Sequence, residues 1–174
     1  MKRIEPKSGQ ESVWDYPRPP RLEESNKHIN VIFNGVVIAE TNRAKRILET
    51  SHPPVYYIPP EDVKLEQYLS PTPRTTFCEW KGAASYYTIT VGDKTVTNAA
   101  WYYHDPMHPY ESLADHVAFY PGKMDACFVN DEQVQAQEGD FYGGWIRHNA
   151  AFSHGQTDAI LGKHVLIVSL RLFG

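Results

Sequence analysis

The chain has 174 residues, of which 41% are hydrophobic. This supports one continuous core and makes a second independent domain unexpected. The 17 basic and 21 acidic side chains are mixed along the sequence and give a net charge of −4, which argues against nucleic-acid and anionic-membrane partners. No run of eighteen apolar residues occurs, and the N-terminus enters charged sequence directly, so we expect a cytoplasmic protein.

The metal-ligating residue types do not form a recognisable site. Cys78 and Cys127 are far apart and belong to no CxxC pair, which excludes a four-cysteine zinc site. Free thiols are the simplest expectation in a reducing compartment, and a disulfide between them is the alternative. The eight histidines offer no HxH or HxxxH pair on one expected element. We therefore expect no metal and no cofactor, and elemental analysis of the purified protein would test the absence of zinc.

The chain divides into three expected parts. Residues 1–28 should form an extended arm, because the Pro-rich stretch 14–20 fixes φ and removes backbone donors. Trp14 and Tyr16 are expected to dock this arm on the body, and a mobile tail is the alternative. A β-rich core domain should cover 29–138. Residues 139–174 should form an extension that folds back on the core or is partly disordered.

The strongest local signal is Asn34-Gly35 between two β-branched runs. Both central positions of a type I′ turn need φ > 0, so this pair predicts a hairpin of 29–33 with 36–39. The next stretch, 42–49, has apolar residues at helical spacing and predicts a short helix.

The rest of the chain is predicted to be mainly strands. We expect a strand at 55–58, a turn or one helical turn that begins at 61–63, and a connecting loop at 70–73. A three-strand meander should follow at 75–80, 84–91 and 94–103. A second helix at 110–119 and a hairpin of 124–129 with 133–135 should complete the core. The fold class is mainly β: a single compact domain of antiparallel meander and hairpins with two short helices. An apolar segment at 165–170 has no visible partner.

Three groups of residues, taken in series, resemble a known family. They are 52–59 with Asp62 and Val63; Thr76 and Cys78 with 81–87; and 99–103 with Pro106. Together they resemble the domain of unknown function 427 family, whose bacterial and fungal members are uncharacterised. The resemblance runs from about Val31 to Val134, and 13–20 and 143–146 resemble the longer members of the family.

The resemblance implies a β-tent-like fold. Such a fold is related in shape to zinc-binding domains such as methionine sulfoxide reductase B, but lacks their cysteine pairs. The resemblance implies no established reaction and no catalytic residue. The chain departs from the longer members after Ile146, where an apolar end replaces a Gly- and Trp-rich one.

Cys78 and Lys81 are candidates for reactive chemistry, because an amine near a thiol favours the thiolate. The alternative is that Cys78 is an ordinary core cysteine. Lys81 is expected at the mouth of a site, with its ammonium in water or on a ligand anion, because an unpaired buried charge is costly. A plain surface lysine is the alternative.

Adjacent aromatic residues recur on three expected strands, at 56–57, 86–87 and 101–103. Alternation places one member of each pair on either face, so one aromatic face is core and the other could line a pocket. Ordinary cross-strand packing is the alternative. The candidate ligand-binding residues are Tyr56, Asp62, Cys78, Lys81, Tyr86, Trp101 and Tyr102.

These observations give two hypotheses. The first is a small-molecule binding domain with an aromatic pocket for a planar or anionic ligand over the meander; whether it is catalytic is left open. The second is a protein–protein interaction module without catalytic activity. Nucleotidyl transfer and esterase chemistry are disfavoured, because DxD, GxxxxGK[ST], GxGxxG and GxSxG motifs are all absent. Assembly into a homo-oligomer is left open.

Overall fold

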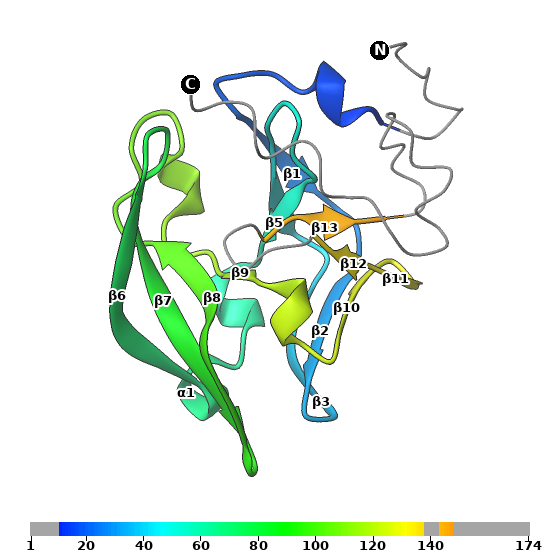
Figure 1. Ribbon diagram of the computed structural model, residues 1–174, viewed down its shortest axis with the longest axis vertical. Coiled ribbons are helices and arrows are strands. Elements are labelled where there is room, and N and C mark those ends of the chain that lie inside the picture. The colour runs from blue at the N-terminus through cyan, green and yellow to red at the C-terminus, as the bar shows by residue number, and fades with distance from the viewer. Residues whose placement is uncertain (1–10, 138–142, 148–174) are drawn as a thin grey trace.

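The computed structural model describes residues 11–137 and 143–147 (Figure 1). Within these ranges, thirteen strands form four antiparallel sheets, and the helical segments are short. The expected mainly-β class is confirmed. No helix among the described residues has the length and apolarity needed to cross a bilayer.

Five strands from the first half of the chain form two sheets, and β10 and β11 from the second half complete one of them. The hairpin at Asn34-Gly35 is confirmed, with φ of 47° and 72° at its two central residues, and it joins β2 to β3. Both strands of the predicted last hairpin belong to the same sheet, and the first of them pairs with β2. The three-stranded sheet has the order β1 (Arg21–Ser25), β4 (Ala44–Leu48), β5 (Val55–Tyr57), and the four-stranded sheet has the order β11 (Glu132–Gln133), β10 (Ala126–Val129), β2 (Ile29–Phe33), β3 (Val36–Thr41).

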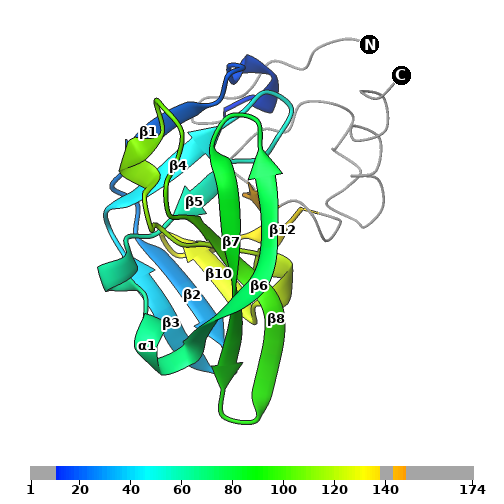
Figure 2. The same cartoon turned by 90° about the vertical axis from the view of Figure 1, so that its left-hand side faces the viewer.

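The meander forms a second four-stranded sheet, as expected. Its order is β6 (Leu69–Cys78), β7 (Gly82–Val91), β8 (Lys94–Tyr103), β9 (Ala118–Phe119). In Figure 1 it stands on one side of the molecule and the β2–β3–β10 strands stand on the other, and Figure 2 shows it in front of the remaining strands. The remaining elements are β12 (Gln135–Ala136) with β13 (Trp145–Ile146), η1 (Val13–Asp15), η2 (Pro60–Asp62), α1 (Leu65–Tyr68), η3 (Glu111–Leu113) and η4 (Pro121–Lys123).

The meander sheet contributes to two hydrophobic clusters, because each face of its strands packs against a different cluster over part of the strand length. Successive residues of a strand point to opposite faces. On β7, Ala84 and Tyr86 belong to one cluster, whereas Ile89 and Val91 belong to the other. We call the cluster around Ile29, Phe33, Ile89 and Phe119 the large core, and the cluster around Tyr57, Tyr86, Trp101 and Tyr103 the aromatic core.

The two predicted helices are wrong. Residues 44–48 form β4, because Lys45 and Arg46 lie opposite Glu24 and Glu23 of β1 and pair with them across the strands. Residues 110–119 contain only the turn η3 before Asp115, whose φ of 57° interrupts a helix. The predicted loop at 70–73 is also wrong, since it lies in β6 at an irregular register between Pro71 and Thr75. Proline is tolerated there because β6 is an edge strand.

The segments that flank the sheets contribute to the interior. Val13 and Tyr16 are buried with Leu48, whereas Trp14 is 39% exposed, so Tyr16 docks on the body and Trp14 is only partly covered. Trp145 is fully buried, and its ring N–H donates to the carbonyl of Phe119 at 3.2 Å. The apolar segment 165–170 lies outside the described residues.

Gly143 lies directly on the ring of Trp101. A Cβ at Gly143 would come within 2.0 Å of Trp101 Cη2, so we expect Gly143→Ala to displace the segment and lower the free energy of unfolding by about 2–3 kcal/mol. Gly122→Ala is the matched control, since its Cβ would meet only Ala136 at 3.4 Å. Urea unfolding of both variants measures the difference, and equal stabilities would refute the contact.

Glu11 should contribute stability that is lost in acid. The hydrogen bonds from Arg46 lower the pKa of Glu11 to about 2. Its stabilisation is therefore present above the ordinary carboxyl range near 4.5 and disappears as the pH falls from there toward 2. The side chain is 45% exposed, so we expect only about 1 kcal/mol. Glu11→Gln should remove this part of the acid dependence in unfolding measured from pH 6 to 2, and Glu66→Gln, an exposed control on α1, should not.

Candidate functional site

Four of the predicted site residues lie together on the aromatic-core side of the meander. Cys78 and Tyr86 contribute to this cluster from β6 and β7, and Trp101 contributes from β8. The Trp101 ring N–H donates to the hydroxyl of Tyr57 at 3.3 Å. Lys81 joins the group through Tyr103, whose ring centre lies 5.9 Å from the lysine nitrogen.

The other three predicted residues lie elsewhere. Tyr56 belongs to the large core, where its ring packs on Trp145 at a centroid distance of 5.3 Å. Tyr102 stacks on Tyr87 at 4.7 Å, on the opposite face of the meander from Trp101. Asp62 accepts hydrogen bonds from Arg43 and Thr41, and the bond from Arg43 is the main reason that its pKa lies below the ordinary range. No single pocket therefore contains the predicted set.

Lys81 is buried, so the expectation that its ammonium lies in water is wrong. The residue is 6% exposed, because the loop at 105–107 covers the β6–β7 turn, with the Met107 N–H bonded to the Lys81 carbonyl at 3.1 Å. Among the described residues, no carboxylate lies within ion-pair distance of it. Burial lowers the pKa of Lys81, but the neighbouring Tyr57 and Cys78 raise it, and the net pKa is above that of an ordinary lysine.

The phenols around Lys81 are kept neutral by burial. Burial is the largest cause of the raised pKa of Tyr57, of Tyr103 and of Tyr110. The Tyr110 hydroxyl donates to the carbonyl of Pro20 at 2.7 Å. The Lys81 ammonium is surrounded by hydroxyls, a thiol and a ring face, and the charge of Glu49 also contributes to its raised pKa.

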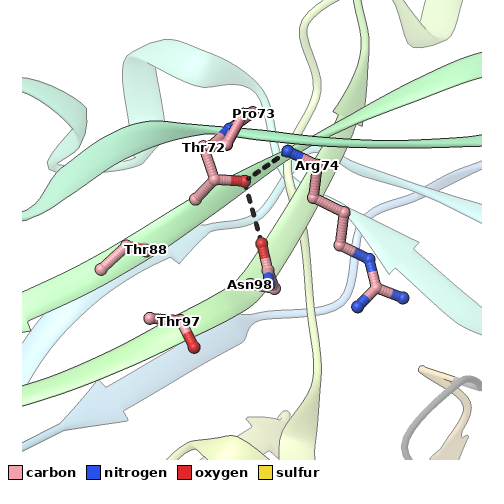
Figure 3. A pocket seen from close by; sticks show the side chains of 6 residues that line it. All are labelled: Thr72, Pro73, Arg74, Thr88, Thr97 and Asn98. Atoms are coloured by element: carbon pink, nitrogen blue, oxygen red, sulfur yellow. Dashed lines mark hydrogen bonds between the residues drawn. The ribbon is translucent and has the colours of Figure 1, made fainter.

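A separate hollow opens on the same face of the meander, nearer the irregular middle of the three long strands. Its volume is about 340 Å³, and Figure 3 shows its lining side chains: Thr72, Pro73, Arg74, Thr88, Thr97 and Asn98. The Thr72 hydroxyl donates to Asn98 Oδ1 at 2.9 Å, which ties β6 to β8 across β7. The lining contains no carboxylate.

Arg74 is the only charged residue that lines this hollow. Its guanidinium carbon lies 4.9 Å from the ring centre of Tyr86, and the Tyr86 hydroxyl is bonded to Thr76 at 2.8 Å. Across the described ranges, Arg74 has no carboxylate partner. Lys123 adds a second positive charge behind β8, where its ammonium donates to the carbonyls of Thr97 and Asn98. The hollow is therefore lined by one positive side chain and several hydrogen-bond donors.

The residues of the hollow were not predicted from the sequence. Thr72 and Arg74 lie in or beside the stretch expected to be a loop. One usable signal was Asn98, because Asn adopts a left-handed φ more readily than most residues, and its φ of 49° marks the irregularity in β8. In the part of the chain that the structure describes, no three His, Cys, Asp or Glu side chains are grouped to hold a metal ion, and both cysteines are free.

Comparison with known proteins gives one match. A family model described as Domain of unknown function (DUF427) matches residues 21–130, which is more than half of the chain, so the chain belongs to this family. No curated protein matches the chain.

The raised pKa of Lys81 predicts a stability difference that depends on pH. A raised pKa means that the charged form of Lys81 stabilises the folded state. This contribution to the free energy of unfolding is complete below the ordinary lysine pKa of 10.5. It is lost as the pH rises through the higher pKa of the folded protein. We expect wild type to exceed Lys81→Met in free energy of unfolding at pH 8, and this excess to shrink by pH 12. Tyrosinate absorbance is followed in both proteins, because the Lys81 charge lowers the pKa of Tyr57 and of Tyr110 and its removal changes their ionisation. An excess that grows with pH would contradict the direction of the shift.

Proposed function

We propose that this member of the DUF427 family binds a small anionic molecule, with a carboxylate or phosphate group held by Arg74 in the hollow of β6, β7 and β8. The observation that carries the proposal is an exposed guanidinium, stacked on Tyr86, in a hollow without a carboxylate. A guanidinium offers paired donors that match the two oxygens of such groups.

The other lining groups support an anion rather than a cation. Asn98 uses its oxygen to accept from Thr72, so its amide nitrogen faces the ligand as a donor with no partner among the described residues. Thr88 and Thr97 add hydroxyl groups beside it (Figure 3). About 340 Å³ is at the lower end of the range of small-molecule sites, which suits a ligand of metabolite size.

The aromatic rings have a supporting role in this proposal. Trp101 is 7% exposed and is covered by Gly143, Tyr57 and Tyr120, so its face is not free to stack on a ligand. Tyr86 orients Arg74 instead. This differs from the aromatic pocket expected from the sequence, while it keeps the expected anionic class of ligand.

An interaction module is the second candidate function. Phe77 favours it, because its side chain is 73% exposed on the edge strand β6, and exposed edge strands pair readily with other chains. Phe77→Ser should leave anion binding in the hollow unchanged, which separates the two functions.

Arg74→Met tests the proposed ligand class. Titration of wild type with inorganic phosphate, and separately with succinate, should shift the backbone amide signals of Thr88, Thr97 and Asn98 in NMR spectra. Loss of the charge and of its paired donors should weaken binding at least about tenfold. Lys64→Met is the control, because it removes one exposed positive charge that does not line the hollow.

Two results would reject the proposal. One is the absence of shifts at these three amides in wild type with either anion at millimolar concentration. The other is an equal affinity of wild type and Arg74→Met, which would show that any binding occurs elsewhere.

A further inference from the structure

The turn between β6 and β7 brings a thiol and an amine together. Cys78 is the last residue of β6 and lies opposite Gly82, the first residue of β7. Gly82 has a φ of 93°, and a Cβ there would lie 3.2 Å from Met107 Cγ. Glycine at this position lets the chain reverse tightly beneath the covering loop. Lys81 immediately precedes it, so its side chain starts next to Cys78.

Both side chains turn toward the aromatic core. The Lys81 nitrogen lies over the Tyr103 ring, and Cys78 packs against the cluster that contains Tyr57 and Tyr103. Lys81 is 6% exposed, and the structure shows no carboxylate to hold it among residues 11–137 and 143–147. The Lys81 nitrogen and the Cys78 sulfur are therefore held against the same aromatic core, at the same turn.

We propose that Cys78 and Lys81 form a redox-dependent covalent bridge, an S–N bond that closes after a peroxide oxidises the thiol. This proposal goes beyond anion binding in the hollow and does not depend on Arg74. It assigns the β6–β7 turn as a modification site.

The chemistry requires one equivalent of hydrogen peroxide. In the first step the Cys78 sulfur attacks a peroxide oxygen, the O–O bond breaks, and the leaving hydroxide takes the thiol proton to give a sulfenic acid and water. In the second step Lys81 gives one ammonium proton to water, its nitrogen attacks the sulfur, and the S–O bond breaks. The leaving hydroxide takes a second proton from nitrogen and forms water. Sulfur loses two electrons and peroxide gains them.

The two cysteines differ in access to the oxidant. Cys78 is partly exposed, whereas Cys127 is 1% exposed and burial raises the pKa of its thiol well above the ordinary value. Oxidation follows thiolate character and exposure, so peroxide should select Cys78. A confined amine then competes with further peroxide for the sulfenic acid.

Mass spectrometry of the full chain tests the bridge. After treatment with hydrogen peroxide, wild type should become about 2 Da lighter, and a thiol reductant should reverse the change. Trypsin should no longer cleave after Lys81, so a peptide of residues 75–94 should appear with the same mass loss. Cys127→Ser should behave as wild type, and Cys78→Ser should show neither change.

Lys81→Met separates the bridge from simple oxidation. It should accumulate sulfenic acid that reacts with dimedone, at a level several times that of wild type. The tryptic peptide of wild type decides the question if this variant does not fold. Intact cleavage after Lys81 in oxidised wild type would overturn the proposal, as would a stable gain of oxygen on Cys78 without the loss of mass.

Discussion

The division of adjacent aromatic residues between two cores is the constraint on which the rest of the structure depends. Tyr56 and Tyr57 lie in different cores, and so do Tyr86 and Tyr87. A slip of one residue in β5 or β7 would exchange every ring between clusters of different shape. Packing in the large core and packing in the aromatic core therefore both fix the register of these strands. The hollow and the Lys81 turn lie at fixed places along the same meander, so their geometry follows from this register.

The sequence predicted the parts of the fold that depend on the backbone conformation of neighbouring residues. Asn34-Gly35 specifies its turn through backbone conformation alone, and the structure agrees. Residues 44–48 have helical spacing of apolar residues, yet they pair with β1 through Glu23 and Glu24, which are distant in sequence. The spacing at 110–119 is likewise overridden by pairing, because Val117 bonds to Ile58 and Ala118 lies opposite Trp101. Both pairings join residues that are distant in the sequence, so the periodicity of apolar residues could not predict them.

The candidate site was predicted in part for a similar reason. Alternation on β8 already separates Trp101 from Tyr102, so these two could not line one pocket, and the structure places them on opposite faces. Alternation could not show that the second face is also covered, because that depends on how the other sheets pack. Arg74 had no motif to mark it, and its significance comes from a hollow whose lining contains no carboxylate, with no ion-pair partner among the described residues. The burial of Lys81 depends on the loop at 105–107, which the sequence does not place.

The flanking contacts of Tyr16 and Trp145 show that the cooperative folding unit is larger than the family match. The match ends at residue 130, yet Val134 and Trp145 belong to the large core, and Val13 and Tyr16 pack on Leu48. A chain trimmed to 21–130 would leave Phe119 and Trp101 open to solvent where Trp145 and Gly143 now cover them. Such a fragment would present apolar surface and tend to self-associate. Relatives that share only the matched region must close these openings with other residues or with a second molecule.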